Sequence, residues 1–310
     1  MSLLSVEGLR TRYVTRGRAT NAVDGVSLTV AAGETVGLVG ESGCGKSSLG
    51  KTILRLVDPA EGSIRLAGQE IAGLSQAALL PVRRRMQMVF QDPFGSLNPR
   101  QTIGTLLDTP LKVHGLGDRA ARRRRVLDII ARVGLPAEAL ERYPHEFSGG
   151  QRQRIGIARA LVLQPELIVC DEPVSALDLS IQAQILNLLV DLKRDLGLSY
   201  LFISHDLSVV RYFADRVLVM YLGRIVESAS HAALWKSPRH PYTRALLAAV
   251  PQADPTRPRG PVALRGELSA ESSGGCRFRT RCPLAFDRCV TEDPALRPDG
   301  TGHAVACHLG

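Results

Sequence analysis

The sequence predicts an α/β fold with a mainly parallel core sheet, and two observations support that class. The first is a strand followed by a glycine-rich loop, because the apolar run 35–39 leads into Gly-Glu-Ser-Gly-Cys-Gly-Lys-Ser at residues 40–47. The second is a series of short apolar runs separated by helical patterns, which is typical of buried parallel strands joined by helices. We also expect an N-terminal antiparallel β subdomain, a helical subdomain and a small cysteine-containing C-terminal extension.

The first half of the chain supplies the β and helical subdomains. Residues 4–30 alternate in polarity like strands, and residues 62–68 form a further β segment between turn residues. Residues 93–163 are mostly helical in pattern, with breaks at prolines and glycines. We therefore place the helical subdomain at about 93–163.

The second half supplies the other core strands. The apolar runs 167–170 and 200–203 flank a helical pattern at 181–196, and the run 217–220 leads into a hairpin at Gly223. Strand, helix and strand in this order predict a parallel sheet with helices on both faces.

The composition changes after Glu227, where prolines become frequent and residues 251–261 look like a linker. We therefore divide the chain into a nucleotide-binding domain, 1–230, and a C-terminal extension, 231–310.

The glycine loop fits the phosphate-binding pattern G-x-x-x-x-G-K-[ST] at every required position. Its glycines let the backbone N–H groups point at a triphosphate, Lys46 supplies a charge for the β and γ phosphates, and Ser47 offers a hydroxyl to Mg²⁺. Residues 48–52 are expected to open the following helix. An accidental glycine turn is the alternative, and the strand before the loop disfavours it. The predicted phosphate contacts are Gly40, Glu41, Ser42, Gly43, Cys44, Gly45, Lys46, Ser47 and Ser48.

Charge and hydropathy limit the classes of protein to which this chain can belong. Hydrophobic residues make up 45% of the chain and charged residues 22%, as in globular proteins, and no apolar stretch is long enough to cross a bilayer. The N-terminus lacks an export pattern, so we expect a cytosolic chain. The net charge of +9 comes largely from arginines at 83–85 and 122–125 without interleaved aromatics. We favour a solvated helix face over nucleic-acid binding, with proximity to the anionic inner leaflet as a middle option.

Two acids follow the apolar run 167–170. Asp171 is placed to hold Mg²⁺, and Glu172 to accept the proton of an attacking water. A strand ending in solvated acids is the alternative. The phosphate loop elsewhere in the chain favours the functional interpretation.

Residues 147–151, Phe-Ser-Gly-Gly-Gln, precede a helical pattern and offer a hydroxyl and free backbone N–H groups to an anion. They resemble the signature motif of ABC ATPases, normally LSGGQ, with Phe147 in place of leucine. The resemblance implies that Ser148, Gly149, Gly150 and Gln151 of one subunit close over ATP bound to the phosphate loop of another. A monomer should then bind ATP and hydrolyse it poorly.

The other motifs of that family match residue by residue. Gln91 resembles the Q-loop glutamine that touches Mg²⁺ and water, and Asp178 ends a Ser-Ala-Leu-Asp segment that resembles the D-loop at the dimer seam. His205 resembles the switch histidine that contacts the γ-phosphate. Tyr13 is the candidate for stacking on adenine, with ordinary core packing as its alternative. The implied cofactors are ATP and Mg²⁺, the metal being held by Ser47, Gln91 and Asp171.

Three further segments resemble the ATPases of oligopeptide, dipeptide and nickel importers: an extended Q-loop at 89–100, His-Pro-Tyr-Thr at 240–243 and the cysteine-containing tail. Tails of that subfamily can carry an iron–sulfur cluster. The tail thiols, separated by five, six and seventeen residues, satisfy the ligand count of [4Fe–4S], although the spacing is not that of ferredoxins. We rank the cluster first, zinc second, with His303 or His308 as substitutes, and no metal third. The four candidate ligands are Cys276, Cys282, Cys289 and Cys307.

The resemblance implies an ATP-hydrolysing subunit of a dipeptide or oligopeptide importer, peripheral on the cytoplasmic face of the inner membrane. Its expected partners are two permease subunits, an extracytoplasmic solute-binding protein and a paralogous ATPase, a heterodimer being favoured over a homodimer. Nickel or another solute is the alternative cargo. A soluble ABC ATPase acting on nucleic acid or ribosomes is the alternative class, and a redox-sensing tail is a further hypothesis.

Overall fold

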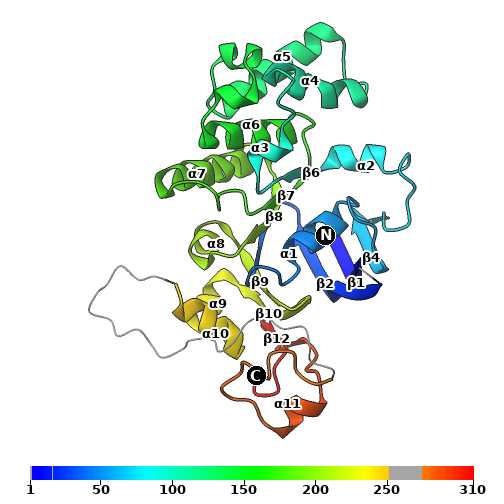
Figure 1. Ribbon diagram of the computed structural model, residues 1–310, viewed down its shortest axis with the longest axis vertical. Coiled ribbons are helices and arrows are strands. Elements are labelled where there is room, and N and C mark those ends of the chain that lie inside the picture. Colours follow the sequence, from blue (N-terminus) through cyan, green and yellow to red (C-terminus); the bar gives the residue numbers. More distant parts are fainter. Residues whose placement is uncertain (1, 16, 251–273) are drawn as a thin grey trace. The chain divides into compact units, whose positions relative to one another are not determined.

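The computed structural model describes residues 2–15, 17–250 and 274–310 (Figure 1). The chain divides into two compact units. The predicted linker 251–261 lies outside the described residues. The helical unit comprises Met1–Leu4, Val30–Glu34 and Arg65–Leu201, and the loop unit comprises Ser5–Thr29, Thr35–Ile64 and Phe202–Gly310.

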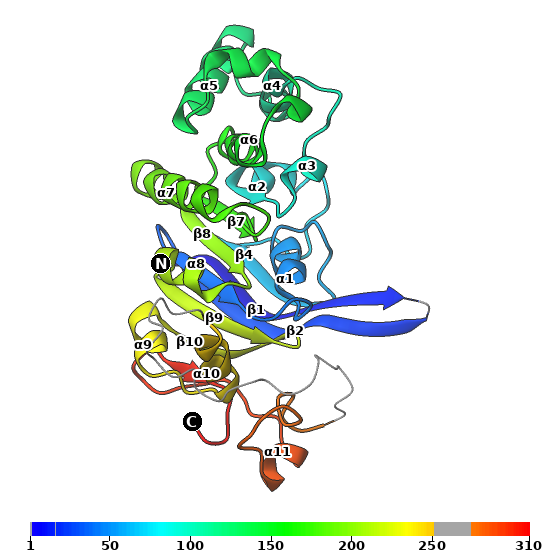
Figure 2. The ribbon, with the colours of Figure 1, turned by 60° about the vertical axis from the view of Figure 1, so that its left-hand side comes forward.

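The chain begins with a long β ribbon. Strands β1 (Ser2–Thr15) and β2 (Arg18–Ala31) are neighbours, and Figure 2 shows them side by side. Strand β4 (Glu61–Leu66) is the other neighbour of β1, and it pairs antiparallel with β5 (Gln69–Glu70). These strands confirm the N-terminal β subdomain predicted from the alternating polarity.

The phosphate loop is carried by a buried strand of the loop unit. Every residue of β3 (Thr35–Val39) is buried, and β3 pairs parallel with β9 (Arg216–Tyr221). The chain then reverses at Gly223, whose φ is 82°, into the antiparallel β10 (Arg224–Ser230). The helices α1 (Lys46–Ile53) and α8 (Leu207–Phe213) belong to this unit.

The C-terminal extension packs onto the far side of β10. Its helices are α9 (His231–Lys236), α10 (Pro241–Ala248) and α11 (Asp287–Thr291), and its strands are β11 (Arg297–Pro298) and β12 (Ala304–Val305). Strand β12 pairs antiparallel with both β10 and β11. The extension therefore adds antiparallel strands to a sheet that we predicted to be mainly parallel, and the sheet is mixed.

A buried carboxylate fastens the end of this extension. Glu227 on β10 is fully buried, and it accepts hydrogen bonds from the backbone N–H groups of Arg239 and His240 at 2.7 and 3.0 Å. The Nε2 atom of His303 lies 2.7 Å from the same carboxylate. A buried carboxylate needs such partners, because leaving it unpaired lowers the free energy of unfolding by about 3 kcal/mol or more.

The helical unit contains a parallel strand pair and a group of helices. Strand β6 (Met86–Val89) pairs parallel with β7 (Leu167–Asp171). Helices α4 and α5 lie together, and both contact α6 (Figure 1). The helices are α2 (Leu80–Arg85), α3 (Pro93–Ser96), α4 (Ile103–Val113), α5 (Arg119–Arg132), α6 (Gly149–Leu161) and α7 (Leu179–Leu196), with 3₁₀ turns at Ala137–Glu141 and Pro144–Glu146.

Local sequence explains how these elements start and stop. Helix α7 begins after Asp178 and ends at Gly197, which adopts the left-handed conformation that favours glycine at a helix end. Strand β8 (Ser199–Ser204) is buried throughout and carries the chain from the helical unit into the loop unit. Among the described residues, no helix combines the length and apolarity that a membrane crossing requires.

Candidate functional site

The backbone of the phosphate loop excludes side chains at two glycines. Gly40 has a φ of 155°, and a Cβ atom there would lie 2.2 Å from the carbonyl oxygen of Met220. Gly45 has a φ of 110°, and its Cβ would lie 2.1 Å from the carbonyl oxygen of Ala22. The predicted need for glycine is thus confirmed at both positions, because no L side chain fits these close approaches.

The loop curls around the ammonium group of Lys46. This side chain is 4% exposed, and its Nζ donates to the carbonyl oxygens of Gly40 and Glu41 at 2.7 and 3.0 Å. Helix α1 begins at Lys46 itself, two residues before the predicted start at Ser48. The first backbone N–H groups of α1 follow the loop directly, as anion binding at a helix start requires.

The remaining loop residues differ in accessibility. Ser42 and Gly43 are exposed, whereas Ser47 and Ser48 are half-buried. Cys44 is buried, and this burial raises the pKa of its thiol. Cys44 therefore contributes packing and a backbone carbonyl, which accepts a hydrogen bond from the N–H of Gly223 at 2.8 Å.

The two acids at the end of β7 are buried in the helical unit. Asp171 is 4% exposed, and Glu172 is 9% exposed with a φ of 46°. A positive φ is uncommon for a residue other than glycine, and such strain is concentrated at functional sites. The Nε2 atom of Gln91 donates to the Glu172 carboxylate at 3.0 Å. In the structure, the predicted Q-loop residue is therefore hydrogen-bonded to the predicted base.

The segment after Glu172 is tied back to it. The backbone N–H and the hydroxyl of Ser175 both donate to the Glu172 carbonyl oxygen, at 3.3 and 3.1 Å. Asp178 follows as the N-cap residue of α7, and Leu179 beyond it is 82% exposed. The predicted D-loop therefore presents an exposed surface next to the strained residue.

The predicted signature motif forms the first turn of α6. The Ser148 hydroxyl accepts from the N–H of Gln151 at 3.3 Å, and the Gln151 side chain accepts from the N–H of Ser148 at 3.0 Å, which is a capping box. A Cβ on Gly150 would lie 2.5 Å from the Ile181 side chain, so this turn packs closely on α7. Phe147, in place of the usual leucine, is 4% exposed.

The other two predicted residues lie in the loop unit. His205 follows β8 directly and is exposed. Tyr13 lies on β1 and is 39% exposed, so its ring is accessible for stacking and is not core material. The predicted site thus forms two groups. Tyr13, the phosphate loop and His205 belong to the loop unit. The helical unit holds Gln91, Asp171, Glu172, Ser148, Gly149, Gly150, Gln151 and Asp178.

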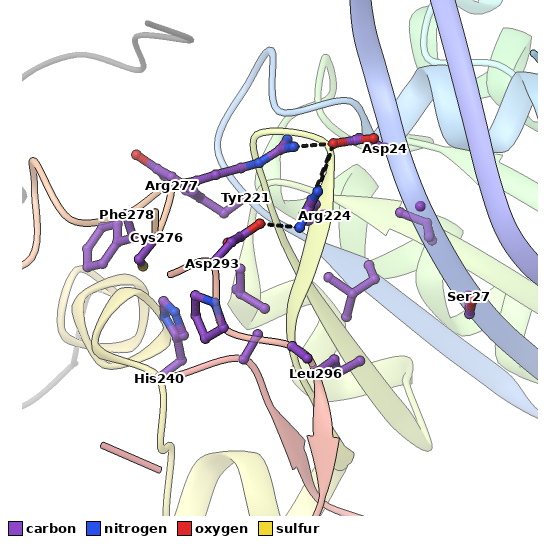
Figure 3. A pocket seen from close by; sticks show the side chains of 17 residues that line it. Asp24, Ser27, Tyr221, Arg224, His240, Cys276, Arg277, Phe278, Asp293 and Leu296 are labelled. Carbon is purple, nitrogen blue, oxygen red and sulfur yellow. Dashed lines mark hydrogen bonds and ion pairs between the residues drawn. The ribbon is translucent and has the colours of Figure 1, made fainter. Parts of the chain in front are cut away.

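The four tail cysteines are free thiols, and Cys276 lines a cavity of about 380 Å³ (Figure 3). The pKa of Cys276 is raised to about 11, mainly by burial, with the Cys289 and Cys282 thiols acting in the same direction. Burial also raises the pKa of Cys282. Across residues 2–15, 17–250 and 274–310, however, no group of three or more histidine, cysteine or acidic side chains is arranged to hold a metal ion. The arrangement of the tail therefore does not support the predicted iron–sulfur cluster.

The histidines proposed as zinc ligands have other partners. His303 bonds to Glu227, and the Nε2 atom of His308 lies 3.0 Å from the carbonyl oxygen of Glu292. The arrangement that would favour zinc is therefore not observed either.

Sequence reasoning missed two residues that contact the phosphate loop. The Tyr242 hydroxyl accepts a hydrogen bond from the N–H of Glu41 at 2.8 Å, and the Arg281 guanidinium forms an ion pair with the Glu41 side chain. Both lie in segments that drew attention for another reason, the His-Pro-Tyr-Thr motif and the cysteine tail. No spacing rule joins residues 41 and 281, so the sequence carried no signal of the contact.

The chain is similar in sequence to known protein families and to individual relatives. Residues 23–175 match the ABC transporter family, and residues 226–289 match the oligopeptide/dipeptide transporter C-terminal region. The chain is 54% identical over 307 residues to a Brucella ovis protein named for peptide import ATP binding, covering 98% of this chain and 97% of that protein. It is 53% identical over 296 residues to the oligopeptide transport ATP-binding protein AppF of Bacillus subtilis, covering 93% and 89%.

A solved structure agrees with the fold. The dimeric post-hydrolysis state of the ATP-binding cassette MJ0796, bound to ADP and Pi, matches with a TM-score of 0.67 at 28% identity, covering 74% of this chain and 98% of that chain. Full-length identity above 50%, the two family matches and the phosphate-loop geometry agree with one another. The chain therefore belongs to the ABC transporter family, as an ATPase that carries the C-terminal region of the oligopeptide/dipeptide branch.

Proposed function

We propose that this ATPase powers the import of dipeptides or oligopeptides across the cytoplasmic membrane. The observation that carries the proposal is the sequence identity to relatives named for peptide import. The aligned residues cover nearly the whole chain and include the C-terminal region at 226–289. The subunit acts on the cytoplasmic face with two permease subunits and an extracytoplasmic solute-binding protein. A paralogous ATPase completes the nucleotide sites.

Glu172 is the proposed general base. Its carboxylate accepts the proton of the attacking water, and the hydrogen bond from Gln91 orients that carboxylate. The strained backbone at Glu172 supports this role, because a φ of 46° is retained only where the surroundings enforce it. Gln91 also begins the segment that leads to α3, so a movement of this segment would alter the bond to the base.

Lys46 and the backbone of the loop are proposed to bind the triphosphate. The Lys46 Nζ now donates to loop carbonyls, and the same ammonium group is a suitable donor to β and γ phosphate oxygens. His205 is proposed to contact the γ-phosphate, and Tyr13 to stack on adenine. Loss of MgATP binding in Lys46→Ala tests the assignment of the loop.

Mg²⁺ fits the donor types that the sequence provides for it. The hydroxyl of Ser47, the amide oxygen of Gln91 and the carboxylate of Asp171 are hard oxygen ligands, which Mg²⁺ prefers. The Gln91 nitrogen is committed to Glu172, so its oxygen is the atom available for a cation. When bound, the ion neutralises charge on the phosphate oxygens.

The active assembly is proposed to be a dimer in which each subunit lends its signature turn to the other's ATP. Ser148 and Gly149 are exposed at the start of α6, and residues 175, 176 and 178–180 are exposed next to Glu172. These surfaces are accessible to a second subunit. A heterodimer with a paralogue is favoured over a homodimer.

The four tail cysteines enter no step of this mechanism. The anaerobic absorption spectrum of the purified protein decides the iron–sulfur prediction directly, since a cluster absorbs in the visible range and zinc does not. Comparing ATPase rates of oxidised and reduced samples tests a redox role of the tail.

The transport proposal is tested in reconstituted vesicles with the permeases, the sister ATPase and the binding protein. We expect ATP hydrolysis to rise when the binding protein is loaded with a dipeptide or oligopeptide, and we expect labelled peptide to accumulate. Stimulation by nickel and not by peptides would contradict the assigned cargo. Co-purification with nucleic acid and without permeases would contradict the transport role itself.

A further inference from the structure

The C-terminal extension contacts the phosphate loop through a partly buried ion pair, in which the Glu41 side chain is 28% exposed. The guanidinium of Arg281 donates to both oxygens of Glu41, NH1 to Oε2 at 2.6 Å and NH2 to Oε1 at 2.9 Å. The Arg281 side chain is only 5% exposed. Two parallel bonds of this kind fix the orientation of a carboxylate more strictly than a single charge contact.

Glu41 is the residue that follows the first glycine of the loop, and it is held at three points. Its side chain binds Arg281, its backbone N–H donates to the Tyr242 hydroxyl at 2.8 Å, and its carbonyl accepts from Lys46 at 3.0 Å. Tyr242 is fully buried on α10. Two of the three points belong to the C-terminal extension, more than two hundred residues further along the chain.

A second contact from the extension reaches the hairpin that supports the loop. Figure 3 shows Arg277 and Arg224 both directed at Asp24, and Arg277 also donates to the carbonyl of Leu222. Burial would raise the pKa of Asp24, but hydrogen bonds and charge from Arg224 and Arg277 lower it below its usual value. The next residue after Leu222, Gly223, donates to the Cys44 carbonyl of the loop.

We infer that the C-terminal extension is a positioning element of the nucleotide site, with Arg281 as the residue that fixes the phosphate loop through Glu41. This inference rests on the proposed binding of the triphosphate by that loop. Arg281 acts through Glu41 and does not itself need to touch the nucleotide. The loop is then held in its phosphate-binding shape before ATP arrives, which reduces the ordering cost of binding.

The alternative is that Arg281 only holds the tail to the core. Both interpretations predict that Arg281→Met lowers the melting temperature, because it leaves Glu41 without its main partner. They differ in nucleotide affinity. Loss of the preformed loop should weaken MgATP binding about tenfold, the effect of one lost charge-assisted hydrogen-bond pair, whereas a merely structural contact leaves the affinity of the folded protein unchanged.

The test uses the full chain at a temperature where every variant is folded, as judged by circular dichroism. Titration with a non-hydrolysable MgATP analogue gives the dissociation constant, and the assembled transporter gives KM and kcat for ATP. We expect Arg281→Met to raise the dissociation constant and KM about tenfold with kcat changed less than about threefold. Arg281→Lys should recover part of the affinity, since lysine keeps the charge without the two-bond geometry.

The matched control is Arg288→Met, which breaks an exposed pair with Glu292 on the same tail. It should leave affinity and KM unchanged. The double variant Glu41→Arg with Arg281→Glu exchanges the two partners, and it should bind the MgATP analogue more tightly than either single variant. Equal affinity of Arg281→Met, Arg288→Met and the unaltered chain would overturn the inference. If Lys46→Ala abolishes binding in that same experiment, the assignment of the loop stands and only the positioning role is lost.

Discussion

The two units hold their halves of the predicted site in different ways. In the loop unit, the phosphate loop is confined by backbone contacts at Gly40 and Gly45 and by the Arg281 ion pair. In the helical unit, the Glu172 carboxylate accepts a side-chain hydrogen bond from Gln91, and its backbone is strained. The loop is therefore fixed within its own unit by several contacts, whereas the base accepts a hydrogen bond from a segment far from it in sequence.

This difference suits the division of labour in an ATPase that drives a movement. A binding loop that is ordered in advance loses little entropy when the phosphates arrive. A base that accepts a hydrogen bond from another segment can be switched when that segment moves. Substitutions in the loop unit should therefore change affinity first, and substitutions in the helical unit should change turnover first.

The largest expected effect is on the turnover side. Glu172→Gln keeps the size and the contact to Gln91 but removes the proton acceptor, so we expect kcat to fall by about 10² to 10⁴. The dissociation constant for MgATP should stay within about twofold. Steady-state ATPase assays of the assembled transporter and nucleotide titrations measure the two quantities. Glu166→Gln, at an exposed acid in the same unit, is the control, and undiminished turnover in Glu172→Gln would reject the assigned base.

The next effect is on the affinity side and compares two glycines of one loop. Gly45→Ala forces a Cβ to within 2.1 Å of a backbone oxygen, whereas Gly43→Ala meets nothing within 4 Å and pays only for its φ of 83°. A positive φ costs alanine about 1 to 2 kcal/mol. Gly45→Ala should therefore weaken MgATP binding at least about tenfold more than Gly43→Ala. Titration of both variants checks this, and equal losses would show that the close approach at Gly45 is not what shapes the loop.

Several features of the fold and site could be predicted because they are encoded locally. The glycines that the loop needs all lie within residues 40–47, and the two acids directly follow the apolar run 167–170. Each feature can therefore be recognised from a short stretch of sequence. The first turn of α7 was missed by two residues because the prediction followed the apolar periodicity from Ile181. The helix begins after Asp178, which occupies the N-cap position without a side-chain capping bond.

The contacts of the C-terminal extension could not be predicted, for two physical reasons. Strand β12 has two residues, too few for any period, and it exists only because it pairs with β10 and β11. The Arg281–Glu41 pair joins residues 240 positions apart, and one arginine among many carries no information about its partner. Conversely, the cysteines drew attention by their number, but their arrangement in the structure does not form a metal site.

A separate effect, on the free energy of unfolding, should come from acid. Burial lowers the pKa of His240 to about 4 from 6.5, although the Glu227 charge opposes this. The unfolded chain therefore takes up this proton at a higher pH than the folded chain. The resulting stability is present above pH 6.5 and is lost as the pH falls towards 4, by about 3 kcal/mol.

The variant His240→Asn isolates this contribution. Asparagine can still accept from the Tyr242 N–H, as the His240 Nδ1 does at 3.1 Å, and it favours the N-cap position of α10. Urea unfolding of both proteins between pH 7 and pH 4 should show a smaller loss for the variant. Parallel curves would mean that His240 is not the group that resists protonation.

The smallest effect concerns the strain at Glu172. The Glu172 carbonyl accepts from both the N–H and the hydroxyl of Ser175, so Ser175→Ala removes one of two bonds that hold the φ of 46°. One such bond contributes about 1 kcal/mol, so we expect kcat to fall about threefold to fivefold with MgATP affinity unchanged. Thr291→Ala removes a comparable hydroxyl-to-carbonyl bond on α11 and should change neither quantity. If Ser175→Ala lowered affinity and left kcat intact, the contrast between a binding unit and a turnover unit would not hold, because a residue of the helical unit would then be acting on binding.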